Sequence, residues 1–357
     1  MLCRMMRGTR RIIAHGSLLA LLLASASCGG ENAPLQDRDP LTAAIERSAD
    51  LLQKSPASIR QENESILARA EEDLRQGRRQ LALLRLANLH GNVATATYRE
   101  GISAEQRKDM ARLDAEWTRM GGVLGEDLGK PSPGAFDGVP AAARALGESA
   151  RAQVRGYYRA SLDYAHNTMP DQGFYYLGSA EGQRAVAEFC RTISAPSNLK
   201  APALRSIRPE LRALEADMLA VYRPPLSIQR HGEFITASST LKEARELDAA
   251  GLHHGALLRY LQAAQLFAPL HQPPSPPLAA DALAAKLQEH AKRLSADGVD
   301  HGIGQLFLET AQTEPAKAAV IAAEVLPRYF AALEPAPSEA PQPESQVTVT
   351  LVRWPYT

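Results

Sequence analysis

Hydrophobic positions recur at helical spacing along most of the chain. One stripe has the i, i+3, i+7, i+10 spacing of a single helix face and consists of Met110, Leu113, Trp117 and Met120. The apolar residues are mostly Ala and Leu, which favour helices. Strand-like runs of Val, Ile and Thr are almost absent before the last eleven residues. The pattern therefore predicts an all-α fold.

Breaks in this pattern predict the ends of the helices. The expected N-terminal helices cover residues 41–54, 58–76, 79–89 and 103–120, and the expected C-terminal helices cover residues 141–165, 174–193, 209–222, 240–250, 254–267, 278–296, 303–311 and 315–333. Ser58 with Gln61, and Ser103 with Gln106, have capping-box spacing and mark two helix starts. Pro327 is expected to kink the last helix.

Composition divides the chain into segments. Residues 126–140 are rich in Pro and Gly and predict a linker between an N-terminal helical unit, 41–125, and a helical hairpin domain, 141–333. Residues 334–346 are mostly Pro, Glu, Ser and Ala and predict a disordered linker. The alternating segment at the start of 347–357 predicts a short β-like tail.

The hairpin over 240–269 has the most distinctive spacing. Gly251 lies at its turn, and the second helix carries Ala256, Leu257, Tyr260, Ala263 and Leu266, with Pro269 just after them. This spacing resembles the second helix of a tetratricopeptide repeat, which implies a tetratricopeptide-like array. Glu243 and Ala244 stand where that family prefers Leu and Gly, and no regular period links the hairpins. An irregular helical bundle is the alternative.

The N-terminus combines arginines, an apolar run over residues 12–24 and the small residues Ser25, Ala26 and Ser27, followed by Cys28. This order resembles the lipobox signal of bacterial lipoproteins, although Ser25 stands where the family usually has Leu. The resemblance implies a signal peptide over 1–27, a lipidated Cys28 and a tether over 28–40. Gly29, in place of Asp, implies an outer-membrane anchor that faces the periplasm. An ordinary cleaved signal peptide is the alternative.

Charge and cysteine content agree with this location. The chain has 40 basic and 40 acidic residues, and the predicted cleavage removes four arginines and no acid. A mildly acidic mature chain lacks the basic footprint that nucleic acid requires, so no nucleic-acid partner is expected. Cys190 would then be the sole free thiol, and we expect it to be buried in a helix.

Half of the ten tyrosines lie in one short stretch, which also contains a histidine: Tyr157, Tyr158, Tyr164, His166, Tyr175 and Tyr176. Aromatic hydroxyls on adjoining helices can line a ligand groove or a peptide-binding face. Packing between helices is the alternative interpretation. The stretch is the first candidate for a binding site.

Motifs for catalysis, metal binding and cofactor binding are missing from the sequence. No HExxH spacing, nucleophile elbow, phosphate loop or dinucleotide fingerprint occurs. We therefore expect neither an enzyme nor a bound cofactor.

The tail carries two further candidate residues, Trp354 and Tyr356, which are suited to anchoring a strand on the edge of a partner's sheet. Alternatively, the tail is a frayed terminus or a strand that lies back on its own domain.

These features together predict a lipid-anchored, periplasm-facing scaffold that binds another protein of the cell envelope. The alternative is a solute- or peptide-binding lipoprotein that uses residues 157–176. A scaffold predicts a long groove or an exposed apolar patch, and a binding protein predicts a concave, tyrosine-lined pocket.

Overall fold

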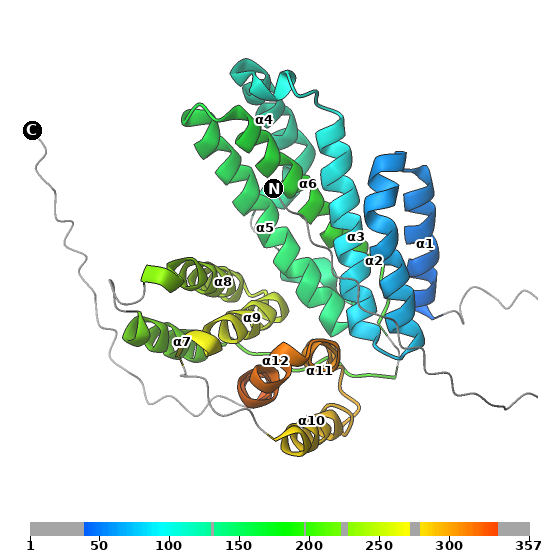
Figure 1. Ribbon diagram of the computed structural model, residues 1–357, viewed down its shortest axis with the longest axis vertical. Coiled ribbons are helices and arrows are strands. Elements are labelled where there is room, and N and C mark those ends of the chain that lie inside the picture. Colours follow the sequence, from blue (N-terminus) through cyan, green and yellow to red (C-terminus); the bar gives the residue numbers. More distant parts are fainter. Residues whose placement is uncertain (1–38, 130–131, 196–197, 223–227, 272–278, 335–357) are drawn as a thin grey trace, which may run out of the picture. The chain divides into compact units, whose positions relative to one another are not determined.

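The computed structural model describes residues 39–129, 132–195, 198–222, 228–271 and 279–334, and within these ranges the chain is all-α, as predicted (Figure 1). The candidate residues Cys28, Trp354 and Tyr356, and the predicted linker and tail over 335–357, lie outside the described residues. The helices are α1 Pro40–Lys54, α2 Ala57–Arg75, α3 Arg79–Glu100, α4 Met110–Leu124, α5 Ala141–His166, α6 Pro170–Arg191, α7 Arg208–Val221, α8 His231–Ala249, α9 His253–His271, α10 Ala280–Leu294, α11 Gly302–Thr313, α12 Pro315–Val320 and α13 Leu326–Leu333.

Neighbouring helices pack as hairpins and then against one another. The pairs α1–α2, α2–α3, α5–α6 and α8–α9 follow one another in the chain, and α3 also packs along α6. Helix α5 contacts both α6 and α9, so it connects the helices of the first half to those of the second (Figure 1). The α8–α9 hairpin turns at Gly251, where a φ of 76° favours glycine.

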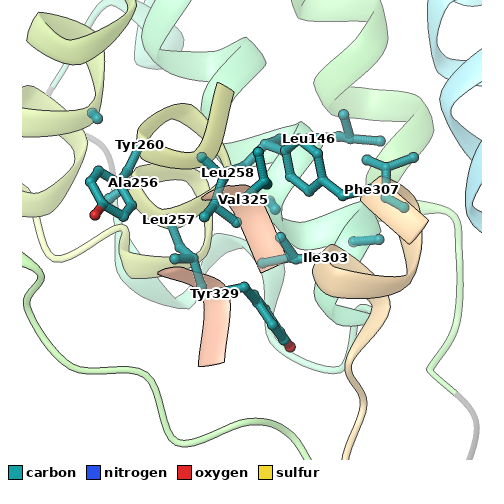
Figure 2. Close-up of a cluster of buried hydrophobic side chains, with 14 of the residues drawn as sticks. Leu146, Ala256, Leu257, Leu258, Tyr260, Ile303, Phe307, Val325 and Tyr329 are labelled. Atoms are coloured by element: carbon teal, nitrogen blue, oxygen red, sulfur yellow. The ribbon is translucent and has the colours of Figure 1, made fainter. Parts of the chain in front are cut away.

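One hydrophobic cluster contains buried side chains from both halves of the chain, including Leu83 of α3 and Leu257 of α9. Figure 2 shows Leu146 of α5 and Leu258 of α9 close to Val325, Phe307 and other side chains of the C-terminal helices. Phe136, in the segment predicted as a linker, also belongs to this cluster and is 1% exposed. Its ring lies against Gly147, where an added Cβ would come within 2.8 Å of Phe136 Cζ.

Three local predictions can be compared with the observed helices. The capping box at Ser103 and Gln106 forms: Ser103 N donates to Gln106 Oε1 at 2.9 Å and Gln106 N donates to Ser103 Oγ at 3.2 Å. The helix start predicted there is wrong, because the box precedes a short 3-10 turn, Gln106–Lys108, and α4 begins at Met110 with Asp109 as its cap. The capping box predicted at Ser58 is wrong, because α2 starts at Ala57 and the Ser58 hydroxyl donates to Glu100 Oε1 instead. Before Pro327 the helix widens into a π-turn over Ile321–Val325, which accommodates the missing proline N–H.

The first turns of several helices are capped by carboxylates from distant parts of the chain. The first N–H groups of a helix have no partner within that helix, and a nearby negative charge stabilises them. Helices α3, α5 and α7 have no side-chain cap from their own N-cap residue. In α3, Leu81 N donates a hydrogen bond to Glu309 Oε2 at 2.8 Å, and at the start of α5, Ala141 N donates to Asp300 Oδ2 at 2.6 Å. At the start of α7, Ile207 N donates to Asp248 Oδ1 at 3.0 Å, and at the start of α9, Gly255 N donates to Glu148 Oε2 at 2.8 Å.

Glu148 is the most deeply buried of these carboxylates, with 0% exposure. Its Oε1 accepts from Arg144 Nε at 2.8 Å, while its Oε2 accepts from the backbone of α9. Burial raises the pKa of Glu148, and the bonds from Gly255 and Arg144 oppose that rise. Gly255 allows the close approach, because an added Cβ would lie 2.9 Å from Glu148 Cβ.

We expect Glu148→Ala to lower the free energy of unfolding by about 3 kcal/mol, because it removes the acceptor of Arg144 Nε and leaves the buried Gly255 N–H without its partner. Glu148→Gln should cost less, since its amide oxygen can still accept from Gly255. Urea unfolding followed by circular dichroism measures both. The control is Glu188→Gln, which removes a half-exposed partner of Arg184 and should change the free energy by less than about 1 kcal/mol. Equal losses at positions 148 and 188 would contradict the proposed role of the buried cap.

A second expectation concerns how the stability of the fold depends on pH. Burial raises the pKa of Glu309 from 4.5 to about 7, although the N–H groups of Leu81 and Gln80 oppose the shift. The stability linked to this group is therefore fully present below about pH 4.5 and is lost as the pH rises through about 7. We expect Glu309→Gln to resemble the wild type near pH 4.5 and to gain about 1 to 2 kcal/mol relative to it at pH 8. Urea titrations at the two pH values test this, and a constant difference would contradict it.

Candidate functional site

The tyrosine-rich stretch borders a polar hollow of about 450 Å³ between α3 and α6, which we name the α3–α6 groove. Helix α2 forms one edge and α5 adds a tyrosine to the other. The polar and aromatic lining residues are Glu62, Asn63, Asn88, Asn92, Thr95, Arg99, Tyr157, Tyr175, Ser179 and Gln183.

Glycines bring α3 and α6 into close contact beneath this groove. An added Cβ at Gly91 would lie 2.9 Å from Val186 Cγ2, and one at Gly182 would lie 2.8 Å from Gly91 O. At the other end of the contact, Tyr98 lies against Gly178, so the two helices run antiparallel. Thr95 Oγ1 also donates to Gly178 O at 3.2 Å. The small residues form a shallow floor, and longer polar side chains stand along its two sides.

Amide side chains occupy one end of the groove. Asn88 and Asn92 are four residues apart on α3 and therefore lie on the same helix face. Gln183 faces the groove from α6. Within the described part of the chain, these three amides form no hydrogen bond to another residue. Asn63 differs, since it is buried and its Nδ2 donates to Ile59 O at 2.8 Å. Each of the three amides offers both donors and an acceptor to a ligand.

The other end of the groove is aromatic and cationic. The Arg99 guanidinium lies 5.8 Å from the centroid of the Tyr175 ring, and Tyr175 is 45% exposed. Tyr176 packs against Tyr175 with its ring edge-on, at 5.4 Å between ring centroids. It also stacks on Tyr164, at 5.0 Å between centroids. Burial raises the pKa of Tyr157, so its hydroxyl stays neutral and can donate a hydrogen bond.

The structure thus brings four predicted tyrosines into one cluster, and two of them, Tyr157 and Tyr175, line the groove. Tyr158 points the other way and packs on α4. It stacks on Trp117 at 4.8 Å and donates to Trp117 O at 3.0 Å, so its role is structural. His166 is exposed at the C-terminal end of α5 and does not line the groove. Cys190 is buried, as expected, and burial raises the pKa of its thiol to about 12.

The sequence interpretation missed the amides and Arg99. The expected helix ended at residue 89, whereas α3 continues to Glu100, so Asn88 and Asn92 were not placed on one face. A helix extended through Gly91 would have shown the i, i+4 pair. Its pairing with Gln183, which is 91 residues away from Asn92, depends on the contact between α3 and α6.

Charged groups in the groove are few. Glu62 and Arg99 are the charged residues among those that line it in the described structure. No group of three or more His, Cys, Asp or Glu side chains that could hold a metal ion occurs among the described residues. Searched over the same residues, the helices include none that is long and apolar enough to cross a membrane.

A second hollow, of about 420 Å³, lies between α7 and α8 and is mainly apolar. We name it the α7–α8 groove; its apolar lining is Met218, Leu219, Tyr222, Phe234, Ile235 and Leu241. Leu219 is 70% exposed and Ile235 is 54% exposed. Large apolar side chains that are exposed side by side mark a surface that binds another apolar group.

In comparisons with known proteins, no protein-family model, curated protein or solved structure matches this chain. The two grooves are therefore the basis on which its function is argued.

Proposed function

We propose that this chain is a lipid-anchored, periplasm-facing protein of the bacterial cell envelope that binds an extended peptide in the α3–α6 groove. The observation that carries the proposal is the set of three amides, Asn88, Asn92 and Gln183, which line one groove without hydrogen-bond partners among the described residues. An amide matches a peptide unit, since each offers an N–H donor and a C=O acceptor.

The spacing of the asparagines favours a peptide main chain as the ligand. Four residues of α-helix rise by about 6 Å. In an extended peptide, successive peptide groups on the same side are two residues apart, which is a rise of about 6.6 Å. Asn88 and Asn92 can therefore bind two successive peptide units on one side of the ligand. From Asn88 to Arg99 the groove runs about 16 Å, which accommodates about five extended residues.

The tyrosine end supplies selectivity. Arg99 presents the planar fork of donors that suits a carboxylate, and Tyr175 supports it from below. The neutral Tyr157 hydroxyl adds a donor. We therefore expect the preferred peptide to carry an acidic group at the Arg99 end and to be otherwise uncharged.

The location rests on the resemblance of residues 1–28 to a lipobox signal. A lipid on Cys28 would confine the groove to the membrane surface, so its peptide ligands would belong to proteins of the same envelope.

A protein-binding scaffold is the second candidate function. The exposed Leu219 and Ile235 of the α7–α8 groove favour it, because an apolar surface of this kind is typical of protein–protein contacts.

The peptide proposal predicts that loss of the amides weakens binding. An array of immobilised hexapeptides would be probed with the full chain in detergent, and the strongest binder would be measured by fluorescence anisotropy. We expect Asn88→Ala with Asn92→Ala to raise Kd roughly 10- to 100-fold, since each lost hydrogen-bonding group costs about 1 kcal/mol or more.

The matched control is Asn167→Ala, an exposed asparagine at the end of α5 that is outside the groove. It should leave Kd unchanged. Binding to no peptide, or equal Kd values for the groove variant and the wild type, would contradict peptide binding. Binding of oligosaccharides in place of peptides would also contradict the peptide-binding proposal.

Lipidation is tested separately. We expect metabolic labelling with a palmitate analogue to label the wild-type chain and a Cys190→Ala variant, and to leave a Cys28→Ala variant unlabelled, because Cys28 would provide the acylated thiol. Equal labelling of the Cys28→Ala variant would rule out the anchor and would leave the peptide-binding test unaffected.

A further inference from the structure

We infer that the α7–α8 groove is the docking site for residues 347–357 of the same chain. This inference is independent of peptide binding in the α3–α6 groove, since the two grooves share no lining residue. It assigns an intramolecular partner to the exposed apolar surface of α7 and α8.

The shape and chemistry of the groove suit an extended apolar segment. Its floor is formed by Met218, Phe234 and Leu241, which are 6%, 7% and 2% exposed. Leu219 and Ile235 stand exposed along its two sides, one on each helix. A segment that lies between them would remove both side chains from water, and each such burial stabilises the contact by roughly 1 kcal/mol or more.

One end of the groove is aromatic. The Tyr222 ring lies 4.7 Å from the Phe234 ring and 5.8 Å from the His231 ring, measured between centroids. The Tyr222 hydroxyl is hydrogen-bonded to His231 Nδ1, which holds the ring in place. Aromatic walls of this kind favour an aromatic partner.

Polar groups at the groove suit the backbone of an extended segment. Ser238 and Ser239 line the groove on α8. Their hydroxyls can donate to and accept from peptide groups, which an extended segment leaves unpaired. The ion pair between Arg245 and Glu215, at 2.6 Å, connects the two helices, and both residues line the same groove.

The sequence of residues 347–357 matches these features. Val347, Val349 and Leu351 alternate with polar residues, so in an extended chain they share one side. Trp354 and Tyr356 follow and supply aromatic rings for the Tyr222 end.

The path of the chain places this segment within reach. The carbonyl of Glu334 accepts a hydrogen bond from Arg205 Nε at 2.9 Å, and Arg205 forms an ion pair with Glu210 in the first turn of α7. The groove residues Met218 and Tyr222 lie eight and twelve residues beyond Glu210, which is about 12 to 18 Å along the helix. Residues 335–346 separate Glu334 from the segment, and a random coil of that length has a root-mean-square span of about 17 to 21 Å. The tether thus matches the distance and gives the segment an effective concentration of the order of millimolar.

The chain provides its own reporter for this contact. It has two tryptophans, Trp117 and Trp354, so a Trp117→Phe background leaves the fluorescence of Trp354 alone. In that background, the full chain in detergent should show blue-shifted emission and slow quenching by acrylamide. Adding Leu219→Glu and Ile235→Glu should shift the emission to the red and raise the quenching constant at least twofold, because two carboxylates prevent apolar docking.

The matched control is Val123→Glu, an apolar position on α4 that is 47% exposed and is remote from α7 and α8 in the chain. It should leave the emission unchanged, and circular dichroism should show that every variant keeps its helices. Identical quenching with and without the groove substitutions would overturn the inference.

A dilution series identifies the occupant. Protection of Trp354 that persists unchanged from micromolar to nanomolar chain supports docking within one molecule. Protection that is lost on dilution would mean that the groove takes the segment of a second copy, and this result would overturn the intramolecular assignment. In each case the affinity for hexapeptides in the α3–α6 groove is measured in the same samples, so failure here is distinguishable from failure of the proposed function.

Discussion

Hydrogen bonds from the first turns of helices to remote carboxyl groups determine how the helices of this protein meet. Glu148 on α5 caps α9, Glu309 on α11 caps α3, and Asp248 on α8 caps the chain entering α7. Each bond satisfies an N–H group that would otherwise lack a partner, and it also connects two elements that are distant in sequence. The buried apolar cluster stabilises the helices in general, whereas these directional bonds specify which helix start meets which neighbour.

The α3–α6 groove depends on the same kind of constraint. Its floor exists because Gly91 and Gly182 let two helices approach more closely than larger side chains would permit. The longer amides along the two sides are then left facing a shared space. Binding in the groove and packing beneath it are therefore linked: a substitution that widens the glycine contact would also change the spacing of Asn88, Asn92 and Gln183.

Local patterns were reliable where the responsible atoms are near in sequence. The capping box at Ser103 formed, since its two partners are three residues apart. The same motif at Ser58 did not, because Glu100 of α3 lies close enough to take the serine hydroxyl. The tyrosine-rich stretch was similarly divided: Tyr157 and Tyr175 line the groove, while Tyr158 packs on Trp117. Adjacent residues on a helix point about 100° apart, so the neighbours α4 and α6 decided between those roles.

The amino-acid sequence by itself determined the all-α class, the hairpin turn at Gly251 and the pattern at Cys28 on which the predicted anchor rests. Each follows from composition or from spacing within a few residues. Tertiary structure decided the continuation of α3 beyond residue 89, the remote caps and the meeting of Asn88 and Asn92 with Gln183. These features join residues up to 228 positions apart. The periodicity of hydrophobic residues along the chain does not predict such pairs, because they form only when whole helices pack.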